Sequence, residues 1–129
     1  MPVSLVDLAP TFCECASIPI PKWMQGSPLP KDPKNDREFS IIEWEQEHLG
    51  KVIHIQTIIT KKFICSNYKK TNLYPNGEGE LYNYDTDPHQ FYNLWNDTKY
   101  NVIKNELLNK LKQNVPPRRK IKLVRVAGA

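Results

Sequence analysis

The sequence predicts an α+β fold: an antiparallel sheet of about four strands, covered by a C-terminal helix and preceded by a short helix and a Pro-rich linker. Two observations carry this prediction. Segments rich in Ile, Val, Thr and aromatic residues recur between residues 38 and 84, and turn-forming residues separate them. Apolar residues then recur at helical spacing from Tyr100 to Leu111. Strands followed by a helix are typical of an α+β domain.

The N-terminal part predicts a short helix. Ser4 is followed three residues later by Asp7, which is the spacing of a capping box. Pro10 fits only in the first turn of a helix or at a break in it, because proline has no N–H to donate at later positions. We therefore expect a tight turn and then a helix from about Leu8 to Ala16. Residues 17–37 contain five prolines and predict an irregular connection, whose length is typical of a segment packed on a larger body.

Four segments have the composition of strands: Glu38 to Glu45, Lys51 to Thr60, Lys62 to Tyr68 and Glu80 to Tyr84. In the second segment alternate residues share a face, so His54 lies on the side opposite to Ile53 and Ile55. Pro75-Asn76-Gly77 is a turn signal before the last strand. Consecutive strands joined by short turns predict an antiparallel meander, one face of which needs cover.

The expected cover is a helix over residues 98–113. Asn96 or Asp97 is a suitable N-cap for this helix. The residues from Val115 to Pro117 end it, because proline cannot continue a helix. One stripe along the helix is apolar and would face the sheet; it consists of Tyr100, Ile103, Leu107, Leu108 and Leu111.

The net charge of +4 comes from the C-terminal tail. Residues 118–129 hold five of the 18 Lys and Arg residues and no acid, so the rest of the chain has 13 basic and 14 acidic side chains. A nucleic-acid-binding fold spreads basic residues over a structured face, so the balance disfavours nucleic acid as a partner. It leaves one alternative function open, an interaction module that binds nucleic acid or anionic partners through the tail. No apolar run approaches the roughly 18 residues of a membrane span, so no membrane partner is expected.

Cysteine and histidine positions predict no catalytic or metal site. Cys13 and Cys15 lack the spacing of a zinc knuckle, and Cys65 stands apart from them. Small, partly buried hydrophobes are the simpler interpretation of all three.

A second hypothesis concerns the middle of the chain, where four polar side chains could line a pocket that another domain completes: Glu45, His48, Lys51 and His54.

The run from Gly79 to Leu94 (GELYNYDTDPHQFYNL) predicts a strand, a turn and an extended approach to the last helix. Asp85 and Asp87 lie two residues apart beside a proline, an arrangement typical of side-chain-to-backbone hydrogen bonds in a turn. We therefore interpret this run as scaffold. The residues that we expect to be structural, here and near the N-terminus, are Asp7, Pro10, Glu80, Leu81, Tyr82, Asp87, Pro88, Asn93 and Leu94.

Three stretches, in order, resemble one family. Residues 3–21 (VSLVDLAPTF followed by IPIP), residues 54–63 (HIQTIITKKF) and the run from Gly79 to Leu94 are similar to segments of the type I sulfatases, the formylglycine-dependent arylsulfatase family. The resemblance spans nearly the whole chain. Relative to the family pattern, Gln56 stands where Arg is usual, Asn83 where Asp is usual and Ser17 where Gly often closes the helix. We therefore add Gln56 to the residues that are predicted to line the pocket. An Arg at this position could bind an anionic substrate.

The resemblance implies a chemistry that this chain does not hold. Sulfatases hydrolyse sulfate esters with a formylglycine made within a C/S-x-P-x-R motif and a calcium ion held by Asp and Asn. No cysteine or serine here has Pro at +2 and Arg at +4, and no Asp-Asp pair is present to hold calcium, so neither cofactor is expected in this chain. We expect residues 1–37 to end a catalytic domain, residues 38–117 to form a C-terminal subdomain and residues 118–129 to be a basic tail. The expected partners are the rest of the catalytic domain and, for the parent enzyme, a sulfated small molecule or glycan. Alone, the chain is expected to be inactive.

Overall fold

The computed structural model describes residues 2–29 and 37–115, and of His48 it describes the backbone only. The predicted basic tail 118–129, part of the Pro-rich linker and the expected Pro116-Pro117 helix stop lie outside the described residues. None of the described helices is long and apolar enough to cross a membrane.

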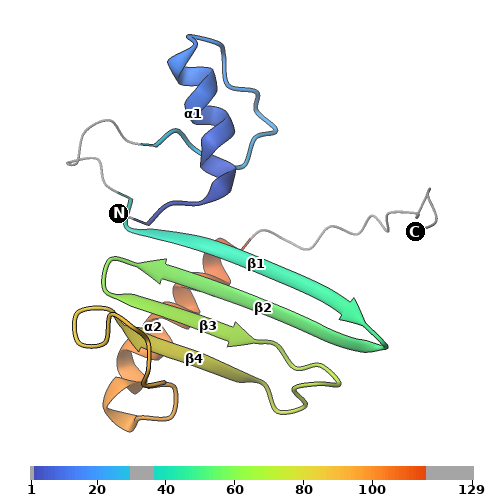
Figure 1. The fold of residues 1–129 in the computed structure, drawn as a ribbon, viewed down its shortest axis with the longest axis vertical. Coiled ribbons are helices and arrows are strands. Elements are labelled where there is room, and N and C mark those ends of the chain that lie inside the picture. Colours follow the sequence, from blue (N-terminus) through green and yellow to red (C-terminus); the bar gives the residue numbers. More distant parts are fainter. Residues whose placement is uncertain (1, 30–36, 116–129) are drawn as a thin grey trace.

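The fold is α+β, as the sequence predicts (Figure 1). A four-stranded antiparallel sheet has the order β1-β2-β3-β4, so each strand pairs with its neighbour in the sequence. The elements in chain order are η1 (Leu5–Asp7), α1 (Leu8–Cys15), β1 (Phe39–His48), β2 (Lys51–Thr60), β3 (Phe63–Tyr68), β4 (Glu78–Asn83), η3 (Thr98–Tyr100) and α2 (Asn101–Asn114).

The strands follow the predicted segments with shifts at their ends. β1 extends to His48, three residues beyond the predicted end, because its pairing with β2 continues to the pair formed by His48 and Lys51. β4 begins at Glu78, which pairs with Tyr68 of β3. Both differences arise from pairing between strands, which extends a strand through residues of weak strand propensity.

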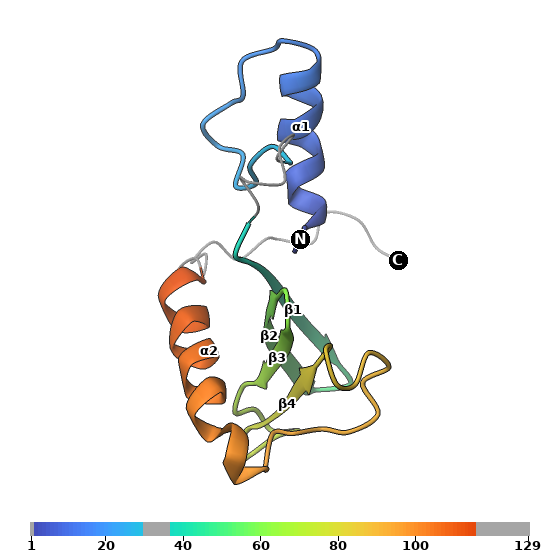
Figure 2. The ribbon, with the colours of Figure 1, turned by 90° about the vertical axis from the view of Figure 1, so that its left-hand side faces the viewer.

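Helix α2 packs across one face of the sheet, and Figure 2 shows it on that side alone. Asp97, one of the two predicted N-caps, caps the short helix η3 that leads directly into α2: its side chain accepts a hydrogen bond from the backbone N–H of Lys99 at 3.0 Å. The buried hydrophobic residues come from three strands and from the predicted stripe of the helix: Ile58, Cys65, Leu81, Leu107 and Leu111. Ile58, Cys65 and Leu81 are brought together because they pair across β2, β3 and β4.

The helix covers the face opposite to the isoleucine row of β2. Ile58 points toward α2, so alternation places Ile53, Ile55 and Ile59 on the other side. Ile42 and Trp44 of β1 pair with Thr57 and Ile55, which puts them on that same side, and they are 47% and 49% exposed. We call the apolar side chains of this side the open face: Ile42, Trp44, Ile53, Ile55, Ile59 and Ile64.

Helix α1 ends in a Schellman motif. The N–H of Ile18 donates to the carbonyl of Cys13 at 2.8 Å, and the N–H of Ser17 donates to the carbonyl of Glu14 at 3.1 Å. The motif requires a left-handed backbone at its closing residue, and Ser17 has φ 56°. Glycine adopts this conformation without steric cost, so Ser17 stands where glycine would be the unstrained choice.

Replacing Ser17 by Gly should therefore stabilise the end of α1. We expect Ser17→Gly to raise the free energy of opening of this helix by about 1 kcal/mol, measured by native-state hydrogen exchange of its amides. Ala16→Gly is the matched control, because Ala16 has φ −86° and gains nothing from glycine. Equal effects of the two substitutions would contradict the explanation by backbone strain.

Candidate functional site

The predicted pocket-rim residues all lie on the hairpin formed by β1 and β2. Glu45 on β1 and His54 on β2 are paired across the strands, and Gln56 follows on the face that α2 covers further along the sheet. His48 and Lys51 form the last pair before the turn. The structure thus brings Glu45, His54 and Gln56 together, whereas Lys51 is exposed near the hairpin tip.

Glu43 connects these side chains and was not predicted. One of its carboxylate oxygens, Oε1, accepts a hydrogen bond from Gln56 Nε2 at 2.7 Å and lies 2.9 Å from His54 Nε2. Glu45 Oε2 lies 3.9 Å from the other ring nitrogen of His54. His54 is therefore held between two carboxylates. Only the strand register reveals Glu43, since it faces Gln56 directly across the pair.

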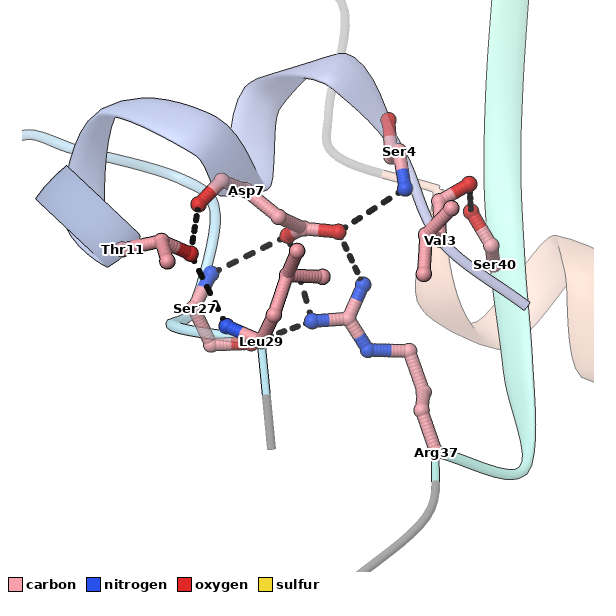
Figure 3. Close-up of polar contacts among 8 residues, drawn as sticks. All are labelled: Val3, Ser4, Asp7, Thr11, Ser27, Leu29, Arg37 and Ser40. Atoms are coloured by element: carbon pink, nitrogen blue, oxygen red, sulfur yellow. Dashed lines mark hydrogen bonds and ion pairs between the residues drawn. The ribbon is translucent and has the colours of Figure 1, made fainter. Parts of the chain in front are cut away.

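A second polar cluster joins the N-terminal segment to the sheet (Figure 3). Asp7 is 1% exposed and binds Arg37, just before β1, through both carboxylate oxygens, with N–O distances of 2.5 and 3.1 Å. The backbone N–H groups of Ser4 and Ser27 donate to the same carboxylate. Thr11 completes the cluster, because its hydroxyl donates to the carbonyl of Asp7 and accepts from the backbone.

This network favours the ionised form of Asp7. Burial opposes the charge, but the hydrogen bonds from Arg37 and from the Ser4 and Ser27 amides outweigh it and hold the pKa of Asp7 below its usual value. A cavity of about 550 Å³ opens beside the cluster and extends along β1 to Glu43. Asp7 was predicted as a structural residue; its partner Arg37 was not, because the two are 30 residues apart.

The run from Gly79 to Leu94 is built around the edge of β4. The Asn93 side chain accepts from the N–H of Leu81 at 3.1 Å and donates to the carbonyl of Gly79 at 3.1 Å. The N–H of Leu94 also donates to the carbonyl of Leu81. Asn93 therefore pairs with the edge strand as a neighbouring strand would. A side chain at Gly79 would meet the ring of Trp95 within 2.5 Å, so this ring packs directly on the strand.

Asp87 holds the turn that follows β4. Its carboxylate accepts from the N–H of Tyr92 at 2.8 Å, and this hydrogen bond lowers the pKa of Asp87. Asp85 donates its N–H to the side chain of Asn83 and lies 3.5 Å from Lys62. The carboxylate of Asp87 therefore shapes the turn, whereas that of Asp85 faces Lys62 in an exposed ion pair.

The described cysteines do not match the sulfatase nucleophile motif. Cys65 is fully buried, and burial raises the pKa of its thiol to about 11, so the group is neutral at pH 7 and packs in the core. Cys13 and Cys15 lie on α1 without the flanking Pro and Arg of the sulfatase motif. In residues 2–29 and 37–115, no three His, Cys, Asp or Glu side chains gather in a way that could hold a metal ion.

Comparison with known families decides the identity. Residues 2–116 match the family described as N-sulphoglucosamine sulphohydrolase, C-terminal. The chain belongs to this sulfatase C-terminal family. No curated protein sequence matches it significantly.

Solved sulfatase structures share the fold of this sulfatase C-terminal chain. A protein assigned as a sulfatase from Bacteroides thetaiotaomicron and a 2-O GAG sulfatase are each 28% identical to it, with a TM-score of 0.69 over 83% of this chain. A third structure, 25% identical with a TM-score of 0.66, is of a protein in complex with its substrate D-glucosamine-2-N,6-O-disulfate. The chain spans only 22–23% of the length of these proteins.

The ion pair between the buried Asp7 and the partly buried Arg37 predicts how the N-terminal segment responds to mutation. Asp7→Asn removes the charge partner of the Arg37 guanidinium and weakens its hydrogen bonds, so residues 2–29 should open more easily, by about 2 kcal/mol. Hydrogen exchange and limited proteolysis of this segment measure the change. Asp85→Asn is the control, because the pair of Asp85 with Lys62 is exposed and should contribute less than about 1 kcal/mol.

The same pair predicts a dependence on pH. The pKa of Asp7 is lower in the folded chain than its ordinary value of 3.8, so its stabilising contribution is complete above about pH 4 and is lost as the pH falls through the folded value. In Asp7→Asn this part of the acid dependence should be absent. An unchanged acid transition in the variant would contradict the assignment.

Proposed function

We propose that this chain is the C-terminal part of a sulfatase, which buttresses the catalytic part and contributes to the rim of the substrate pocket. The family match supports this proposal, as does the small share of each related sulfatase that the chain spans. The nucleophile and the calcium site would lie in the remaining polypeptide. There a formylglycine and a calcium ion would supply the sulfate-ester chemistry, since the described residues of this chain fit neither.

Uncovered apolar surface is the observation that carries the proposal. Among the described residues, five hydrophobic side chains are buried, whereas fourteen large ones are exposed. Eight of the exposed ones lie between Val3 and Trp23, and α1 buries only Pro10. Phe12 on this helix is 67% exposed. A helix with so little cover gains little from packing, so it fits a larger body that would bury it.

The open face gives the second contact surface. A sheet whose two faces are both apolar is typical of a sheet covered on both sides, and α2 covers only one. Ile42 and Trp44 stand at its exposed end on β1. Burying a large apolar side chain contributes about 1.5–3 kcal/mol, so these two residues alone would add substantially to an interface. We assign the catalytic part of the sulfatase as the occupant of this face.

The pocket rim would consist of the hairpin residues Glu45, His48, Lys51 and His54, with Gln56 beneath them. Two carboxylates, Glu43 and Glu45, flank His54, and carboxylates repel sulfate groups. This part of the rim therefore suits hydroxyl or amino groups of a sulfated glycan or small molecule. The substrate of the third related structure, a disulfated glucosamine, carries hydroxyl groups beside its two sulfates.

The purified chain alone should not hydrolyse an aryl sulfate, because it lacks the nucleophile. Release of the phenol from an aryl sulfate, followed by absorbance at neutral pH, tests this. We expect a rate equal to that of buffer. Turnover that stays with the chain through two further purification steps would contradict the proposal.

The proposed association of this chain with a catalytic part can be tested with the catalytic part of a related sulfatase. The probe is the Bacteroides thetaiotaomicron sulfatase without the 23% that this chain matches, co-expressed with the chain. We expect the two to co-purify. Trp44→Ser should weaken the association at least tenfold, as is usual for a central Trp, while changing the stability of the isolated chain by less than about 1 kcal/mol. Val102→Asn, an exposed position on α2, is the matched control.

Failure of the wild-type chain to associate with this probe would count against the docking role. Association that is equally strong in Trp44→Ser and in the wild type would move the contact away from the open face. In either case the family assignment stands, because it rests on the sequence match.

A further inference from the structure

The tip of the β1–β2 hairpin holds a residue that the turn disfavours. His48 pairs with Lys51, so only Leu49 and Gly50 form the loop. Both have positive φ, 50° and 71°. Two-residue hairpin loops with two positive φ values favour Asn or Asp followed by Gly, because these residues tolerate the left-handed region. Gly50 meets this requirement and Leu49 does not.

Packing does not compensate for this choice. The Leu49 side chain is 87% exposed, the highest exposure among the large hydrophobic residues that the structure describes. An exposed Leu in a left-handed conformation is unfavourable twice, through its backbone and through its contact with water. Within the described chain, nothing gained in folding explains a leucine at this position.

The tip is nevertheless held firmly by another loop. Asn72, between β3 and β4, donates from Nδ2 to the carbonyl of Gly50 at 2.6 Å and accepts at Oδ1 from the N–H of Val52 at 3.0 Å. These two hydrogen bonds fix the strand immediately after the turn. The exposed leucine is thus presented on a supported hairpin, which reduces the loss of conformational freedom when the tip is bound.

We propose that Leu49 is an anchor residue that inserts into an apolar recess on the catalytic part of the sulfatase. The inference rests on the proposed function and specifies where the hairpin contacts its partner. The chain spans 23% of the related sulfatase, so the occupant is a larger polypeptide. The apolar row of the open face begins at Ile53, close behind the tip, so the two surfaces are continuous. A sulfated sugar is polar and gains little from a leucine, which favours protein over glycan.

Two substitutions separate turn strain from contact. Leu49→Asn relieves the strain and removes the apolar side chain; Leu49→Met keeps an apolar side chain and the strain. For the isolated chain, we expect Leu49→Asn to raise the melting temperature by about 4 °C or more and Leu49→Met to leave it nearly unchanged. Val102→Asn, which introduces Asn at an exposed helical position, should not raise it.

Binding is measured with the same co-expressed catalytic probe, quantified after separation by titration of the purified parts. We expect Leu49→Asn to lose at least tenfold in affinity although it is the more stable chain, and Leu49→Met to stay within threefold of wild type. A stability gain together with a binding loss cannot come from general unfolding.

Each other outcome overturns the inference. If the wild type binds and Leu49→Asn binds as tightly, Leu49 is not an anchor, while the docking role stands. If Leu49→Asn does not raise the melting temperature, the turn is not strained and the argument for a functional leucine fails. If neither the wild type nor any variant binds, the docking role itself fails and the anchor fails with it.

Discussion

The contact between α2 and one face of the sheet determines the rest of this structure. Leu107 and Leu111 of the helix meet Ile58, Cys65 and Leu81, and these five side chains form the buried core. Because neighbouring residues of a strand point to opposite faces, fixing Ile58 toward the helix fixes every other side chain of the sheet. The polar hairpin residues Glu43, His54 and Gln56 follow on the helix side. The isoleucine row follows on the open face.

The sequence predicts the strands and helices but not which face the helix covers. β2 carries isoleucine on both faces: Ile53, Ile55 and Ile59 lie on one face and Ile58 on the other. The pattern of β2 therefore does not indicate which face packs against the helix. The deciding information lies in β4, where Leu81 stands between Glu80 and Tyr82. The candidate site shows the same limit. Glu45 and His54 could be named from residue type, whereas Glu43 and Arg37 depend on strand register and on a contact across 30 residues.

The run from Gly79 to Leu94, which resembles a sulfatase segment, is organised by structural contacts rather than by reactive groups. An edge strand exposes unpaired N–H and C=O groups that can pair with another chain. Here Asn93 occupies those groups on Leu81 and Gly79, and Asp87 shapes the turn that returns the chain to this edge. The resemblance of this run to sulfatases therefore says little about where the reaction takes place.

Position 56 shows how burial changes the meaning of a departure from the family pattern. An Arg there would suit an anionic substrate if it were exposed, but Gln56 is 7% exposed and its amide donates to Glu43. Any further polypeptide that packs on this face of the sheet can only reduce the exposure of the residue at position 56. An Arg at this position would thus neutralise Glu43, whereas Gln56 satisfies a hydrogen bond and leaves the carboxylate charge in place beside His54. The difference between Gln and Arg at this position therefore acts on the local charge around Glu43 and His54, and it would make the proposed rim more acidic.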